Sequence, residues 1–414
     1  MSIAKSVFHW ERVVPVRFAR APDVDDPTVF SGPVDADAPD PDDRGFVSWS
    51  AHGVTHPAGS AVLPIGLDPT GDPELRPKTR VCLIRQEIDA SAPLFLTLES
   101  GGVVSIELPS AVPAALPGTP LMMIKLRAQA AGSTHLEVRF GSAGGPIIHR
   151  LEVVVNPMID VRMTMHVPTV NGAPLNDPNG NVLPPVSNRT DQQLFSFLED
   201  VNKVFFPYGI RLLPDVTVDR AGVLKLAHQG TVDDGTEFDR TVALNRAAHS
   251  VNAYFVPAIV ERASAVASSR QPGGIGGVGV SLVTNPADFG LLVADFVSDV
   301  TAGSGTLPVD PHAIAHEVGH VLNLINDPSG RFVHVNREVD LSTGEEHDVR
   351  DDIVSRRRLL YAFTDFGGTA ARHPYRDDVG YGDNSVGGML SVKQLNNDPT
   401  DLEMAEVRRS AARL

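Results

Sequence analysis

The sequence predicts an α+β protein in which an all-β region precedes a region of mixed strands and helices. Short apolar runs separated by turn residues fill residues 73–157, and this pattern is typical of a β-sandwich. Beyond residue 158, stretches with a helical spacing of apolar residues alternate with strand-like runs. The length of 414 residues suggests two or three domains. We therefore divide the chain into an N-terminal extension (1–72), a β-sandwich (73–157) and an α+β domain (158–414).

The first 72 residues are rich in proline, aspartate and glycine. Residues 14–18 have strand-like character, whereas the acidic, proline-broken stretch 23–43 is typical of a loop or an arm over a neighbouring domain. Cys82 is the single cysteine, so the sequence excludes an internal disulfide framework and a cysteine-based zinc site. In the β-sandwich region we predict strands at residues 80–84, 94–98, 103–108, 121–128, 135–140 and 147–155.

The α+β region opens with alternating polar and apolar residues at 160–167, which predict a half-buried strand. Thr190 and Gln193 form a capping-box pattern, which predicts the start of a helix that Pro207 ends. We predict further strands at 209–213, 250–256 and 278–283 and a final helix at 401–413. The apolar residues 289–296 fit a strand or a helix, and we favour a helix, because they follow an Asn-Pro pair.

Residues 274–279 fit the G-x-G-x-x-G pattern of dinucleotide-binding loops. That pattern has this function only where a strand precedes it and a helix follows it. Here a polar loop precedes the glycines and a valine-rich strand follows them. We therefore interpret them as a flexible entry into the strand that follows, with no cofactor-binding role.

The clearest chemical signal is the H-E-x-x-H pattern that begins at His316. Asp310 is a favourable N-cap, Pro311 suits the first helical position, and apolar residues recur at three- and four-residue intervals, so the pattern lies on a helix. His316 and His320 then share one helix face and can bind the same metal ion. Glu317 follows the first histidine, where its carboxylate can reach a metal-bound water and take its proton. These residues predict a Zn²⁺ site and the hydrolytic chemistry of a zinc peptidase.

This region is similar to the catalytic domain of the metzincins, a family of zinc metalloproteases. The order strand, helix, three strands and zinc helix resembles the N-terminal half of that domain, and residues 206–212 and 252–257 resemble its local sequence. The resemblance covers residues 158–414 and implies hydrolysis of peptide bonds, with Glu317 as general base. The polypeptide substrate would lie extended beside an exposed edge strand, residues 278–283. Residues 73–157 resemble the immunoglobulin-like accessory modules of many secreted or surface enzymes, which implies a docking role and a possible protein partner.

The chain departs from the metzincin pattern H-E-x-x-H-x-x-G-x-x-H after the second histidine. Asn323 occupies the glycine position, and asparagine tolerates the left-handed conformation that the turn requires. Asn326 occupies the third-ligand position, although a carboxamide is a weak zinc ligand. We favour His334 as the third ligand, because a short turn-like insertion would loop out and return it to the metal. The alternatives are Asp327, the more remote His347, a downstream glutamate such as Glu338, Glu345 or Glu346, or no third protein ligand.

Metzincins place a methionine-containing turn beneath the zinc, and two stretches compete for this role. Residues 358–361 resemble the turn with Leu360 in place of methionine, whereas Met389 runs directly into a sequence that resembles the terminal helix. We favour the turn at Leu360. The departures at positions 326 and 360 motivate an alternative, a catalytically inactive binding or assembly protein with the metzincin fold. A protease effector delivered by a secretion machine is a further alternative.

The composition bears on partners and location. A formal net charge of −16 argues against nucleic-acid binding and against attachment to an anionic membrane surface. No stretch approaches the length of a membrane span, so we expect no membrane insertion. The first residues lack the apolar run of a secretory signal. We therefore expect a cytoplasmic protein, or one that is exported by a signal-less route.

Overall fold

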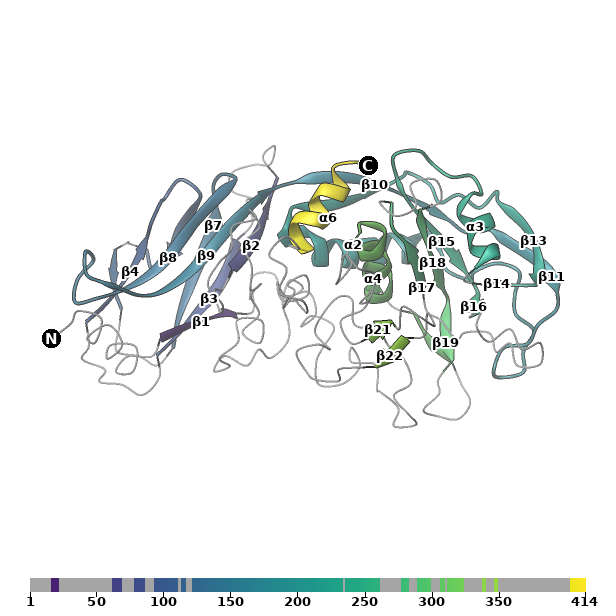
Figure 1. Ribbon diagram of the computed structural model, residues 1–414, viewed down its shortest axis with the longest axis horizontal. Helices are drawn as coiled ribbons and strands as arrows, with labels where there is room; N and C mark the ends of the chain where they lie inside the picture. The colour runs from purple at the N-terminus through teal and green to yellow at the C-terminus, as the bar shows by residue number, and fades with distance from the viewer. Residues whose placement is uncertain are drawn as a thin grey trace.

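The computed structural model describes residues 16–21, 62–68, 78–85, 93–110, 113–116, 121–233, 235–260, 277–282, 289–298, 306–309, 311–323, 337–339, 346–348 and 403–414. These residues form a mixed α+β fold with many strands and few helices. Figure 1 shows two lobes along the long axis, an all-β lobe that contains β1 to β9 and an α+β lobe that contains the later elements. No helix within these residues is both long enough and apolar enough to cross a membrane.

Two sheets form the all-β lobe. The first has the strand order β1-β3-β7-β5, with bounds Val16–Ala21, Lys78–Arg85, Leu121–Ala128 and Val104–Leu108. The second has the order β2-β9-β8-β4-β6, with bounds Val62–Leu67, Ile147–Pro157, Gly132–Phe140, Leu94–Leu98 and Ala114–Ala115. Buried apolar side chains from both sheets, including Phe18, Leu96 and Ile124, make one cluster. The six strands predicted for residues 73–157 are confirmed as β3, β4, β5, β7, β8 and β9.

The segment 1–72 contributes one strand to each sheet. β1 pairs antiparallel with β3, and β2 pairs parallel with β9 at the edge of the second sheet. Phe18 and Leu63 from these strands are fully buried in the cluster. The described parts of residues 1–72 therefore belong to the all-β lobe, although the sequence analysis assigned them to a separate extension. The acidic stretch 23–43 lies outside the described residues.

A five-stranded sheet, with the order β12-β10-β15-β18-β17, is the centre of the α+β lobe. Its strands, in that order, are Ile210–Pro214, Ile159–His166, Val251–Val256, Gly290–Ala294 and Gly277–Val280. The first four are parallel, and β17 pairs antiparallel with β18 at the edge. The strands predicted near 160–167, 209–213, 250–256 and 278–283 are thus confirmed. The helix predicted at 289–296 is wrong, because β18 is a strand whose five residues are all buried.

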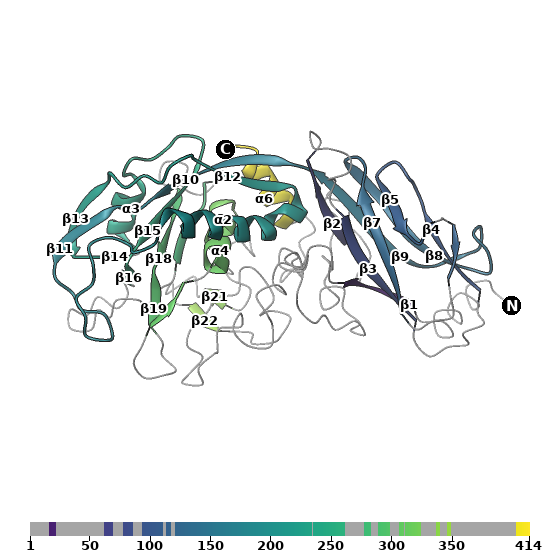
Figure 2. The ribbon, with the colours of Figure 1, turned by 180° about the vertical axis from the view of Figure 1, so that it is seen from behind.

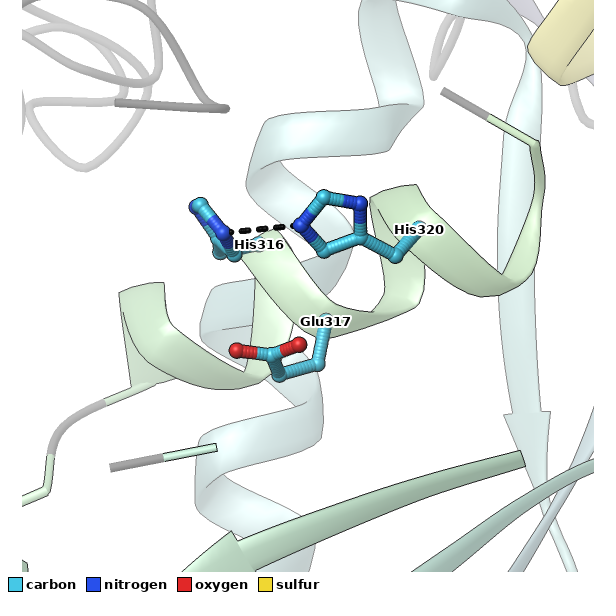
Figure 3. A group of neighbouring side chains, drawn as sticks. All are labelled: His316, Glu317 and His320. Atoms are coloured by element: carbon cyan, nitrogen blue, oxygen red, sulfur yellow. Dashed lines mark hydrogen bonds between the residues drawn. The ribbon is translucent and has the colours of Figure 1, made fainter. Parts of the chain in front are cut away.

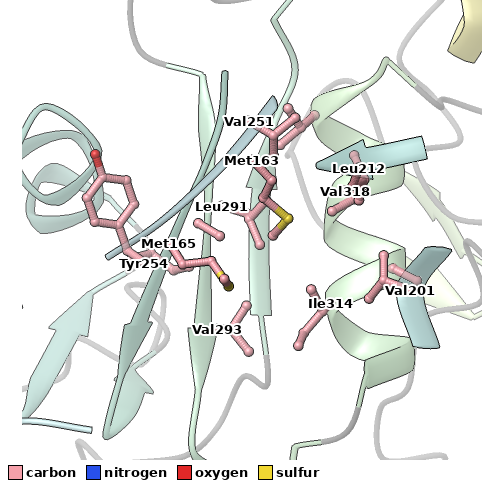
Figure 4. Close-up of a cluster of buried hydrophobic side chains, with 14 of the residues drawn as sticks. Met163, Met165, Val201, Leu212, Val251, Tyr254, Leu291, Val293, Ile314 and Val318 are labelled. Atoms are coloured by element: carbon pink, nitrogen blue, oxygen red, sulfur yellow. The ribbon is translucent and has the colours of Figure 1, made fainter. Parts of the chain in front are cut away.

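Two helices, α2 (Asp191–Phe205) and α4 (Pro311–Val321), contact each other and pack against this sheet. Figure 4 shows side chains of the sheet, among them Met163 and Leu291, facing Val201 of α2 and Ile314 and Val318 of α4. α2 begins at the predicted capping box, in which the N-cap hydroxyl and the glutamine side chain each accept a backbone N–H of the other residue. This apolar layer fixes the position of α4 on the sheet.

Shorter elements complete the described part of the lobe. β11 pairs with β13, β14 with β16, β19 with β20 and β21 with β22. The helix predicted at 401–413 is confirmed as α6. The bounds of these elements are Thr169–Ala173 (β11), Phe206–Tyr208 (η2), Val223–His228 (β13), Thr231–Asp233 (β14), Thr236–Val242 (α3), Ala258–Val260 (β16), Phe296–Ser298 (β19), Thr306–Pro308 (β20), Arg337–Val339 (β21), Glu346–Asp348 (β22) and Glu403–Ala411 (α6).

The two lobes are connected by the strands β9 and β10, and the helix α6 binds the backbone at their junction. β9 ends at Pro157 and β10 begins at Ile159, so one nearly continuous strand runs from the first lobe into the second, as Figures 1 and 2 show. α6 lies near this junction. Its Arg408 donates hydrogen bonds to the backbone carbonyls of Tyr208 (2.6 Å), Gly209 (3.0 Å) and Pro157 (3.0 Å).

Candidate metal centre

The H-E-x-x-H residues lie on α4, as predicted, in a helix that is buried on more than one side. Its residues from 314 to 323 are each less than one-tenth exposed. Ile314, Val318 and Val321 belong to the apolar cluster between the helix and the sheet. Packing therefore holds the helix in place and fixes the backbone positions of its polar residues.

His316 and His320 face each other on one side of this helix. Their Nε2 atoms are 3.0 Å apart, and their ring planes cross at 74° with centroids 4.7 Å apart (Figure 3). The two residues are only 6 % and 7 % exposed. This is the arrangement expected of histidines one helical turn apart whose side chains converge on a common point.

The two histidines fit a zinc ion. Zinc binds imidazole nitrogen at about 2.0–2.1 Å in a tetrahedral arrangement, which places two such nitrogens about 3.3 Å apart. The Nε2 atoms at 3.0 Å would need to separate only slightly. One ligand atom from each of His316, Glu317 and His320 lies within 4.8 Å of the others. This trio is the candidate metal group that the described part of the chain contains.

Glu317 lies beside the histidine pair and against strand β17. Burial raises the pKa of Glu317 to about 8, although a hydrogen bond from the backbone N–H of Gly279 opposes the rise. A cation held by the neighbouring histidines would favour the charged carboxylate, because an opposite charge within a few ångströms lowers the pKa of a carboxyl group. A carboxyl group of this kind can accept a proton near neutral pH and release it again.

Strand β17 carries two glycines at the contact with α4. A methyl group at Gly277 would lie 2.6 Å from Cγ of Glu317, and one at Gly279 would lie 2.5 Å from the backbone oxygen of Glu317. The sequence analysis gave these glycines only the role of a flexible strand entry. Their spacing of two residues in a strand, which directs both to one face, is the signal that would have identified this contact.

The C-terminal end of α4 is tied to the residues that follow β17. Asn323 has φ of 64°, so the left-handed turn predicted at this position is confirmed. Its side-chain oxygen accepts a hydrogen bond from the hydroxyl of Ser281 (2.7 Å), and the N–H of Leu282 donates to the carbonyl of Val321 (3.1 Å). The second bond satisfies a carbonyl that the helix end leaves without an intrahelical partner, and the first joins the side chain at the turn to the residue after β17.

The entry to α4 is tied to the sheet by a buried ion pair. Arg189 donates to the carbonyls of Ala294 (2.7 Å) and Val309 (3.1 Å), and its Nε lies 3.3 Å from the Oδ1 of Asp295. Burial raises the pKa of Asp295, against the effect of hydrogen bonds and of this guanidinium. The sequence analysis missed the pair because its members are more than 100 residues apart and neither lies in a recognisable motif.

Several predicted residues lie outside the described residues. They are His334 and Asp327, the candidate third ligands, Asn326, Glu345, Leu360 and Met389. Of the remaining alternatives, Glu338 and Glu346 are in the hairpin of β21 and β22, where Glu338 is opposite His347. The structure thus brings together three of the four predicted site residues, His316, Glu317 and His320.

No protein-family model matches the chain, and no curated protein is similar to it at a significant level.

Proposed function

We propose that this protein is a zinc-dependent endopeptidase. The observation that carries the proposal is the geometry of α4, in which two histidine Nε2 atoms face each other at 3.0 Å and the carboxyl group of Glu317 lies beside them. Two neutral imidazoles and an adjacent carboxylate are the residue types that hold a catalytic zinc ion and move a proton.

The residues have distinct roles in this proposal. His316 and His320 bind the metal, and His334 completes the site as third ligand. A zinc ion in such a site lowers the pKa of a coordinated water to about 7 and polarises the substrate carbonyl. Glu317 accepts a proton from the attacking water and donates it to the amine that leaves.

A polypeptide is the substrate that suits the surroundings of Glu317. β17 is the last strand of the five-stranded sheet as described, and its residues Gly277 and Gly279 contact Glu317. An extended peptide that pairs with an edge strand gains backbone hydrogen bonds irrespective of its side chains. Such a peptide along β17 would bring a peptide bond close to the carboxyl group.

The architecture supports a metzincin-like assignment. The zinc helix follows a sheet of parallel strands with an antiparallel edge strand, and α2 packs against both. We further propose that the all-β lobe is an immunoglobulin-like accessory domain that docks a protein partner. Its two-sheet structure with a shared core is compatible with this role. The net charge of −16 argues against nucleic acid as a partner, and we propose none.

Metal content is the first test. Elemental analysis of the wild type and of His316→Ala, His320→Ala and His334→Ala after mild dialysis should give about one zinc per wild-type chain and much less in each variant. If His334→Ala retains zinc while His316→Ala and His320→Ala lose it, His334 is not the third ligand. A wild type that binds no zinc after reconstitution would contradict the proposal.

Cleavage is the second test. A peptide library incubated with the zinc-loaded wild type should yield products, whereas Glu317→Ala should bind zinc and cleave at least about 100-fold more slowly. Equal cleavage by both proteins would show that Glu317 is not the general base.

A binding or assembly protein with the same fold is the second candidate. The distance of 3.0 Å also suits a hydrogen bond between the two imidazoles, and Asn326 replaces the family's third histidine. In that case zinc addition would leave the thermal stability of the protein unchanged. The endopeptidase instead gains stability from zinc, and the gain is lost in His316→Ala.

A further inference from the structure

The three atoms nearest to a methyl group added at Gly277 of β17 all belong to the side chain of Glu317. A methyl group added at this glycine would lie 2.6 Å from Cγ, 2.7 Å from Oε1 and 2.9 Å from Cδ of Glu317. Carbon atoms in van der Waals contact are about 3.5–4.0 Å apart, so the carboxyl group would have to move. The side chain of Glu317 thus fills the space that a Cβ atom at position 277 would take.

Gly279 differs from Gly277 in what it meets. A methyl group there would lie 2.5 Å from the backbone oxygen of Glu317 and 3.0 Å from Cβ of His320. A residue larger than glycine at this position would press on the backbone of α4 rather than on one movable side chain. The N–H of the same glycine donates a hydrogen bond to the Glu317 carboxyl group.

Glycine is required at positions 277 and 279 because a side chain there would overlap α4, and not because the backbone adopts a conformation that only glycine tolerates. Neither has a positive φ, whereas glycines such as Gly180 and Gly209 do. The backbone conformation of β17 therefore allows an alanine, and the nearest atoms that an alanine side chain would meet belong to α4. The glycines allow the helix to approach the strand closely, so that β17 forms one wall around the carboxyl group.

We propose that Gly277 is a positioning residue for Glu317. The absence of a side chain at Gly277 allows the carboxyl group to lie against β17, where the N–H of Gly279 holds it beside the two histidines. The inference rests on the proposed function, because it concerns the group that we propose as general base. It adds that the edge strand on which we expect the peptide to bind also determines the position of the base.

A larger residue at position 277 has a specific consequence. The carboxyl group moves while His316 and His320 keep their places, because the methyl group at Gly277 meets no atom of either histidine among its nearest neighbours. Gly277→Ala should therefore reduce the rate of hydrolysis without reducing metal binding. A shorter acid at position 317 should relieve the crowding that the methyl group causes.

A double-mutant cycle tests the contact without reference to activity. We would measure the thermal unfolding of chelator-treated wild type, Gly277→Ala, Glu317→Asp and the double variant. Gly277→Ala should lower Tm by about 4 °C or more, and in the double variant most of this loss should disappear. Gly279→Ala should lower Tm at least as much, but Glu317→Asp should not relieve it. Additive effects of Gly277→Ala and Glu317→Asp would overturn the proposal.

Activity and zinc content provide the functional readout. Zinc-loaded Gly277→Ala should retain about one zinc per chain and an unchanged KM, with kcat reduced about 10-fold or more. Gly144→Ala, at an open position in the all-β lobe where a methyl group meets nothing within 4 Å, is the matched control and should retain wild-type kcat. A kcat unchanged in Gly277→Ala would reject the positioning role. A wild type without hydrolytic activity would contradict the proposed function, while the unfolding cycle would still decide whether the contact exists.

Discussion

Replacing Glu317 with glutamine tests how the protein tolerates a buried carboxyl group once metal has been removed with a chelator. Burial raises the pKa of Glu317 from its ordinary value of 4.5 to about 8. In the unfolded chain the group ionises near its ordinary pKa, so at intermediate pH the folded state holds a proton that the unfolded state has released. Folding stability should therefore fall as pH rises through this interval and level off above about pH 8. Glu317→Gln removes this dependence.

The size of the effect follows from the two pKa values. Each tenfold change in proton affinity corresponds to about 1.4 kcal/mol, so the difference between 4.5 and about 8 amounts to about 5 kcal/mol. We expect Glu317→Gln to exceed the wild type in stability by about 5 kcal/mol at pH 9, about 3 kcal/mol at pH 7 and less than about 1 kcal/mol at pH 5. The amide oxygen of glutamine can still accept the N–H of Gly279, so the hydrogen bond contributes little to the difference.

Urea unfolding of both chelator-treated proteins at these three pH values is the assay. Glu199→Gln, at an exposed position on α2, controls for the loss of one negative charge. A stability difference between wild type and Glu317→Gln that does not grow from pH 5 to pH 9 would refute the reasoning. It would mean that the carboxyl group is hydrated in the metal-free protein.

Three further predictions concern the groups that hold the site and the lobes in place. Asn323→Val should lower stability by about 2 kcal/mol in urea unfolding, because a β-branched residue is strained at a φ of 64°, whereas Asn323→Gly should cost less. Arg189→Met leaves Asp295 buried without its cation and should lower the free energy of unfolding by about 3 kcal/mol in the same assay. The control is Arg220→Met, which removes an exposed ion pair, and a larger loss of stability in the control would contradict the prediction. Arg408→Met removes three hydrogen bonds at the junction of the lobes and should separate thermal unfolding, followed by calorimetry, into two transitions where the wild type shows one.

Local chemistry made part of the fold predictable. The start of α2 follows from Thr190 and Gln193, which satisfy each other's backbone N–H groups whatever the rest of the chain does. The turn at Asn323 follows from the tolerance of asparagine for a left-handed conformation. The facing of His316 and His320 follows from the helical repeat alone.

The elements that we could not predict from the sequence depend on contacts between distant parts of the chain. β18 is buried on both faces, so it lacks the alternation that distinguishes a strand from a buried helix. β2 contains Pro64 and pairs with β9, about 90 residues further along the chain, so neither composition nor local pairing indicates a strand. The spacing of Gly277 and Gly279 indicates a strand face without side chains, but that this face contacts Glu317 depends on how α4 packs on β17.

The near-continuity of β9 and β10 makes the all-β lobe an inseparable part of the protein. Val62 and Val154, from two strands of that lobe, are fully buried in the apolar cluster of the α+β lobe. Deleting the lobe at the boundary between the strands would remove these two side chains and expose the apolar surface that they cover in the α+β lobe. The all-β lobe therefore cannot be replaced by another domain unless the strands at the junction are kept. In the docking role that we propose for this lobe, a change of partner should arise in its loops, with the junction strands retained.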